Sequence, residues 1–123
     1  MTKADRRKIH RYILTVAQAM NLGHWEIILS DGDPTDELGA AEVYSARGRR
    51  TAIVSVASDF LETPKSQQRH VIVHELVHVH FACPDHVIHQ SVSEEIHRAW
   101  NVSCEYSIDA IAEVLAPFMP MPE

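Results

Sequence analysis

Cysteine, glycine and proline are scarce in this sequence, and it has no long apolar run. The 123 residues include two cysteines, four glycines and six prolines, which excludes a collagen-like or low-complexity chain. Cys83 and Cys104 form neither a CxxC metal motif nor a disulfide framework, so we expect buried free thiols. No apolar run approaches the ~20 residues that a membrane-spanning helix requires. A membrane partner is therefore not expected.

Basic charge is also limited. The sequence contains 11 lysines and arginines and 17 acidic residues, which give a formal charge of −6 at pH 7. This balance disfavours general electrostatic binding to nucleic acid, although Arg47, Arg49 and Arg50 form one local basic spot. The segment from Met1 to Lys8 is charged and polar and lacks the apolar core of a signal peptide. We therefore expect a cytoplasmic protein.

The composition and length of the sequence are those of one globular domain. Its 46% hydrophobic and 23% charged residues are typical of folded proteins, and this length suffices for a core without disulfides. No internal repeat, low-complexity tract or linker divides the chain. We expect a single domain over residues 1–123, and the sequence does not indicate its oligomeric state.

The first half predicts a helix followed by strands. Apolar residues between Ile9 and Met20 recur at three- and four-residue spacing, as on an amphipathic helix. Thr2 with Asp5 suits the start of this helix, and the segment 21–23 suits its end. Three β-prone runs follow, and the last two flank a turn and predict a hairpin: 25–29, 41–45 and 51–57.

The second half predicts two helices. Thr63 and Pro64 have the form of an N-cap and a first helical residue, for a helix that runs to about Phe81 and is stopped by Pro84. A further helix, capped by Ser91 with Glu94 or by Ser93, continues to Leu115. The fold class is therefore α+β: an N-terminal helix, a three-stranded sheet and two helices.

The first of these two helices contains the motif HExxH at residues 74–78. His74 and His78, four residues apart, share one helical face, so both imidazoles can bind one zinc ion. Glu75 lies about 100° around the helix, beside the metal, where it can accept a proton from the attacking water. The alternative is a pair of core histidines satisfied by hydrogen bonds, with Glu75 exposed.

A catalytic zinc site needs a third protein ligand, and Glu105 is our candidate. It lies on the flank of the apolar stripe that helical geometry predicts for the last helix, where it can face a metal. Asp109, one turn further, can hydrogen-bond the second nitrogen of a ligating histidine. The alternative for both acids is exposure to solvent. The predicted stripe comprises Ile96, Trp100, Cys104, Ile108, Ile111 and Leu115.

HELVH at residues 74–78 with Glu105-x-x-x-Asp109 resembles the gluzincin branch of the zincin metallopeptidases. The stretch from Glu105 to Ala112 looks more particularly like the ImmA/IrrE type associated with phages and prophages, although that family usually has Asn and Phe at the positions of Asp109 and Ile111. The metzincin pattern is missing, because Phe81 and Pro84 occupy the positions of its glycine and third histidine. SprT-like proteins use a later histidine as third ligand, which leaves His86, His89 and His97 as rivals to Glu105.

The resemblance implies a minimal zincin-like domain with one Zn²⁺ per chain, in which Glu75 activates the zinc-bound water that hydrolyses a peptide bond. It also implies that an edge strand at Ile53, Val54 and Ser55 holds the peptide substrate by backbone pairing. The group that stabilises the oxyanion stays open among four residues: Tyr44, His80, His97 and Tyr106.

The expected function is hydrolysis of a protein or peptide substrate in the cytoplasm, which for a phage-encoded protein is that of the host. A non-catalytic, zinc-stabilised protein-binding module is the first alternative, and a zinc-dependent nuclease is the second.

Overall fold

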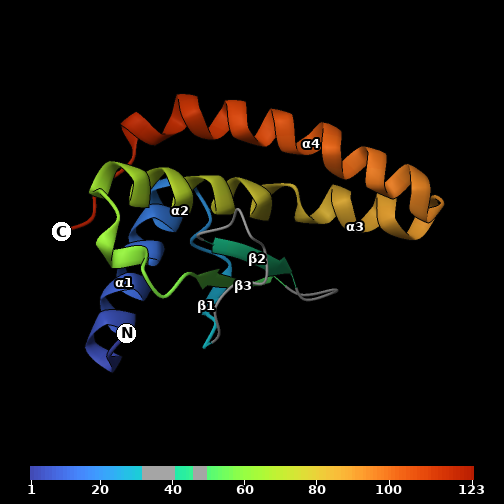
Figure 1. Ribbon diagram of the computed structural model, residues 1–123. Helices are drawn as coiled ribbons and strands as arrows, with labels where there is room; N and C mark the ends of the chain where they lie inside the picture. The colour runs from blue at the N-terminus through green and yellow to red at the C-terminus, as the bar shows by residue number, and fades with distance from the viewer. Residues whose placement is uncertain (32–40, 46–49) are drawn as a thin grey trace.

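The computed structural model describes residues 1–31, 41–45 and 50–123, and for residues 41–45 and Cys83 it describes the backbone alone. The α+β class is confirmed (Figure 1). The predicted turn at 46–49 and most of the one at 30–34 lie outside the described residues. Within the described ranges seven main elements follow one another: α1 (Lys3–Ala19), β1 (Glu26–Leu29), β2 (Ala41–Ser45), β3 (Thr51–Val56), α2 (Lys65–His80), α3 (Ala82–Ser91) and α4 (Glu94–Leu115). Two short 3₁₀ turns, Phe60–Glu62 and Ala116–Phe118, precede α2 and follow α4.

The predicted start of α1 is confirmed. The Thr2 hydroxyl accepts a hydrogen bond from the Asp5 amide, and the Asp5 carboxylate accepts one from the Thr2 amide, so both orphan amides are satisfied. After the helix, Asn21 adopts the left-handed conformation with φ of 63°, which asparagine tolerates well. The apolar stripe of α1 is buried in the core at Ile9, Ile13, Val16 and Ala17.

The sheet has the strand order β1-β3-β2, with β1 parallel and β2 antiparallel to β3. The antiparallel pairing of β2 with β3 agrees with the predicted hairpin. Since β3 is the central strand, both of its edges are already paired. The prediction that Ile53, Val54 and Ser55 offer a free edge to a peptide is therefore wrong. Val54 and Ser55 are also buried, as expected for the middle of a sheet.

The predicted end of α2 near Phe81 is confirmed, and its predicted start is one residue early. The helix begins at Lys65, and Pro64 is its extended N-cap residue. Thr63 lies one residue before this cap, and its hydroxyl donates to the Phe60 carbonyl at 2.7 Å. At the other end Phe81 is the C-cap residue of α2, so the prediction that Pro84 stops the helix is wrong: Pro84 lies in the first turn of α3. Proline is tolerated there because amides of a first turn have no partner within the helix.

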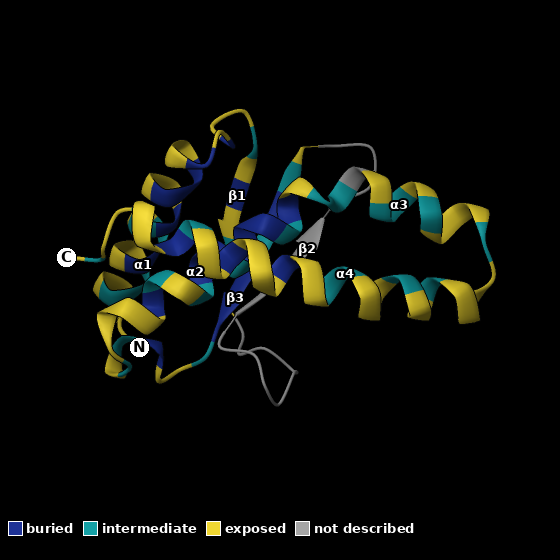
Figure 2. Cartoon of the chain, turned by 90° about the horizontal axis from the view of Figure 1, so that it is seen from above, coloured by how far each residue is buried: buried dark blue, intermediate teal, exposed yellow. Residues whose placement is uncertain are grey.

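The last helix, α4, begins as predicted, with the Ser93 hydroxyl accepting from the Ile96 amide. It packs along α2 (Figure 1). Its phase differs from the prediction: Ile108 and Ala112 are buried, but Ile96 is 56% exposed and Ile111 37% exposed. Cys104 is half-buried rather than buried. Figure 2 shows the long exposed side of α4.

The hydrophobic core lies between α1, the sheet and the inner faces of α2 and α4. Among helices in the described part of the chain, none combines the length and apolar character needed to cross a membrane. This core therefore holds α2, the helix that carries the HExxH motif, in place from two sides.

Candidate metal centre

The HExxH motif lies in the middle of α2, which core packing holds rigidly. The apolar residues around the motif are almost fully buried: Ile72, Val73, Leu76, Val77 and Val79. Their packing fixes the rotation of α2 about its axis, so that His74 and His78 turn together toward α4. The two imidazole rings lie with centroids 5.0 Å apart and planes inclined by 61°. Both rings therefore border the same small space.

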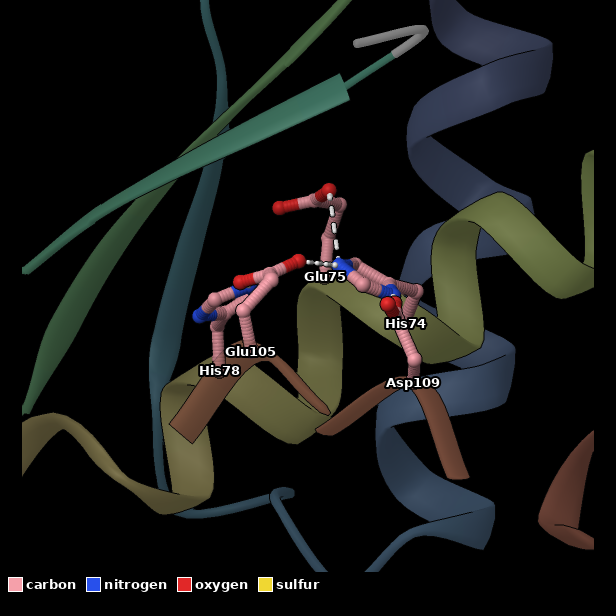
Figure 3. A network of polar contacts seen from close by, with 5 residues as sticks. All are labelled: His74, Glu75, His78, Glu105 and Asp109. Carbon is pink, nitrogen blue, oxygen red and sulfur yellow. Dashed lines mark ion pairs between the residues drawn. The ribbon is translucent and has the colours of Figure 1, made fainter. Parts of the chain in front are cut away.

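Glu105 of α4 completes this space (Figure 3). Its Oε1 lies 2.8 Å from Nε2 of His74, and its Oε2 lies 3.1 Å from Nε2 of His78. One ligand atom from each of the three residues lies within 4.8 Å of the others. Two imidazole nitrogens and a carboxylate are a ligand set that zinc binds, and modest spreading would bring each atom to its ~2.0 to 2.2 Å coordination distance. The residues present therefore fit a zinc ion.

Asp109 approaches His74 from the opposite side of the ring. Its Oδ1 lies 2.9 Å from Nδ1 of His74, so Nδ1–H can donate to this carboxylate while Nε2 faces Glu105. A neutral imidazole has only one N–H, yet carboxylate oxygens face both nitrogens of this ring. A cation on the Glu105 side would satisfy both the ring nitrogen and the carboxylate. A metal ion there satisfies His74, His78 and Glu105 together.

The electrostatics of His78 suit metal binding. Burial lowers the pKa of His78 below its ordinary value, and the nearby Glu105 carboxylate opposes this shift without overcoming it. The neutral imidazole, which is the form that binds a metal, is therefore favoured at His78.

Glu75 lies beside the ligands without belonging to the cluster. Its residue is only 9% exposed, and its Oε1 is 4.0 Å from Nε2 of His74. In Figure 3 its carboxylate stands apart from those of Glu105 and Asp109, which reach the cluster from α4. The alternative in which Glu75 is simply exposed is contradicted. A buried carboxylate next to His74 is well placed to exchange a proton with a molecule held there.

Other sequence candidates lie elsewhere. In the part of the chain that the structure describes, the ligand cluster contains none of His86, His89 and His97. His97 instead contacts Asp85 and His89. His80 Nε2 lies 2.9 Å from the Met20 carbonyl at the end of α1, which removes it from the candidates for oxyanion stabilisation.

Of the remaining oxyanion candidates, Tyr106 is 75% exposed, and the side chain of Tyr44 lies outside the described residues. The sequence pattern does not identify Asp85 as a partner of His97, because Pro84 predicts the end of a helix and leaves Asp85 outside any helix. The presence of a proline just before a polar stretch can mark the first turn of a new helix as well as the end of an old one.

Comparisons with known proteins give no relative for this chain: no family model matches it, and neither does any curated protein or solved structure.

Proposed function

We propose that this protein is a zinc-dependent metallopeptidase of the gluzincin type, most similar to the ImmA/IrrE metallopeptidases, with one Zn²⁺ per chain. The observation that carries the proposal is the convergence of His74, His78 and Glu105 on one space while Glu75 stays beside it. Three protein ligands leave a position open for substrate or water, which is the arrangement of catalytic zinc sites rather than structural ones.

Each residue of the site has a distinct role in the proposed reaction. His74, His78 and Glu105 hold the metal ion, and Asp109 fixes the tautomer and orientation of His74 from the far side of its ring. Glu75 accepts a proton from the attacking water and returns it to the leaving amine. When bound, zinc supplies Lewis acidity toward the scissile carbonyl and makes water more acidic. The substrate is a protein or an exposed peptide, cleaved in the cytoplasm.

The binding-module alternative uses the same metal without turnover. Such a module is favoured by a fourth protein ligand that closes the metal. Among the described residues, the cluster has three potential ligands and retains Glu75 as a separate buried acid. This arrangement supports an enzyme.

Metal content and hydrolysis test the proposal together. We would purify wild type, His74→Ala, Glu105→Ala and Glu75→Gln without chelators, measure zinc by mass spectrometry, and assay cleavage of a peptide library. The expected result is one tightly bound zinc ion in wild type and Glu75→Gln, no tightly bound zinc in His74→Ala, and reduced zinc in Glu105→Ala. Cleavage should occur with wild type alone.

Two other outcomes would change the assignment. Zinc binding with no difference between wild type and Glu75→Gln in any cleavage assay would favour the binding module. Four metal-free proteins would show that the histidines of α2 serve only the core.

A further inference from the structure

A second pair of histidines lies outside the candidate metal centre, between α3 and α4. The two helices lie beside each other in both views, extending away from α1 (Figures 1 and 2). His89 near the end of α3 and His97 in the first turn of α4 face each other across this hairpin. Their Nδ1 atoms are 3.1 Å apart, and the ring centroids are 4.3 Å apart with planes inclined by 62°.

The outer side of His97 is held by a carboxylate. Asp85 Oδ1 lies 3.4 Å from Nε2 of His97 and also accepts a hydrogen bond from the Trp100 indole N–H at 3.2 Å. With its proton on Nε2 toward Asp85, a neutral His97 presents an Nδ1 lone pair to His89. The His97 side chain is only 16% exposed, so its orientation is fixed by packing as well as by Asp85.

The distance between the two Nδ1 atoms suits a shared metal ion. Two nitrogens that each bind one ion at ~2.0 to 2.1 Å stand roughly 2.9 to 3.4 Å apart for ligand angles between square and tetrahedral. The observed 3.1 Å falls inside this range. The rings are also closer than a collinear N–H···N hydrogen bond would place them, because 3.1 Å plus two ring radii exceeds the 4.3 Å between centroids. The two rings would therefore have to rotate apart for their lone pairs to converge on a third atom.

We propose that His89 and His97 form a second site for a divalent transition metal ion, distinct from the centre at His74, His78 and Glu105, with Asp85 as the carboxylate that orients His97. A ligating histidine with a carboxylate on its other nitrogen is the usual arrangement at protein metal sites. Imidazole ligands select zinc, nickel or copper over magnesium and calcium. With two protein ligands and an exposed His89, water fills the other positions, so the ion binds more weakly than at the first centre.

The ion would link α3 to α4. Since α4 also carries Glu105, this link constrains the helix that supplies the third ligand of the first centre. The inference does not require the proposed peptidase activity, because its two histidines and Asp85 lie outside that cluster.

Zinc stoichiometry at a rising series of buffered free zinc concentrations tests the proposal. The proteins are wild type, His89→Ala, His97→Ala and Asp85→Asn, with His24→Ala as control because His24 is an exposed histidine in the segment after α1. The expected result is that wild type and His24→Ala take up a second, weaker ion, which both His89→Ala and His97→Ala lose. For Asp85→Asn the second ion should bind about 10- to 100-fold more weakly.

The same series in a His74→Ala background separates the two centres, since it should lose the tighter ion and keep the weaker one. Circular dichroism checks that each variant is folded, and His89→Ala, at an exposed position, gives the cleaner answer if His97→Ala is destabilised. The proposal is overturned if no second ion binds to wild type. It is also overturned if the weaker ion binds equally well to wild type and His89→Ala, or if His24→Ala weakens it as much.

Discussion

Asp109 Oδ1 lies 2.9 Å from Nδ1 of His74, the ring nitrogen opposite the one that faces Glu105. The carboxylate therefore selects the tautomer in which Nε2 carries a lone pair toward the metal centre. It does so from α4, the same helix that provides Glu105. One turn of α4 thus supplies both a ligand and the group that orients another ligand.

The first prediction follows from this contact. Replacing Asp109 with asparagine should weaken zinc binding about 10- to 100-fold, because the uncharged amide holds the His74 tautomer less firmly. Competition with a chromophoric chelator measures the affinity. Glu113→Gln is the matched control, since Glu113 is an exposed acid one turn further along α4. Equal losses in the two variants would show that general negative charge, rather than the His74 contact, supports binding.

The second prediction concerns pH. Burial lowers the pKa of His78 in the folded protein below its ordinary value of 6.5. The unfolded chain then takes up a proton at His78 before the folded protein does, so metal-free protein should lose stability as pH falls through about 6.5 toward the lower folded pKa. Above that window both states are neutral at His78 and its contribution does not vary. Urea unfolding of metal-free wild type and His78→Gln at several pH values measures the effect.

His78→Gln should show a shallower decline of unfolding free energy on acidification than wild type. Parallel pH profiles for the two proteins would mean that His78 titrates alike in the folded and unfolded states. His24→Gln, with its exposed side chain, should follow the wild-type profile.

Much of the candidate site could be predicted because it depends on local geometry. The spacing of His74 and His78 fixes their common face once α2 forms, and Glu75 must then point elsewhere. The choice of Glu105 over His97 needed the rotation of α4, which its sequence pattern gave only approximately. Apolar residues occur on nearly every side of that helix, so the stripe through Ile96 and Ile111 was as plausible as the real one.

The strand order depends on contacts that no local pattern records. The short separation of β2 and β3 in the sequence predicts that the two strands pair as a hairpin. Such a hairpin often lies at the edge of a sheet, and one of its strands is then an edge strand. Here β1 pairs with β3 in parallel, in register from Glu26 with Thr51, and places β3 in the middle. That choice depends on how α1 and α2 cover the sheet, which is a property of the whole core.

The third prediction concerns the start of α1. Thr2→Ala removes the hydroxyl that accepts from the Asp5 amide and should lower the free energy of unfolding by about 1 kcal/mol. Thr15→Ala is the control, because Thr15 is exposed within the same helix and its hydroxyl donates only to the Arg11 carbonyl. That variant should be neutral or slightly more stable, since alanine favours helix interiors. Chemical denaturation compares them, and equal stability of Thr2→Ala and wild type would contradict a functioning cap.

The fourth prediction tests the observed phase of α4. Ile108 is 1% exposed and lies three residues beyond Glu105, so its packing helps to set where that ligand points. Ile108→Ala should reduce the free energy of unfolding by about 2 to 5 kcal/mol, the usual range for truncating a buried aliphatic side chain.

Ile111→Ala removes the same atoms from a side chain that is partly exposed, and it should cost much less. Denaturant unfolding of the two metal-free variants measures the difference in their free energy of unfolding. Their zinc affinity then shows whether the loss of packing also affects metal binding at Glu105. We expect weaker zinc binding in Ile108→Ala than in Ile111→Ala, because a loosened α4 no longer holds Glu105 against both histidines. If Ile111→Ala were the more damaging variant, α4 would be rotated from its position here, and Glu105 would turn away from His74 and His78 with it.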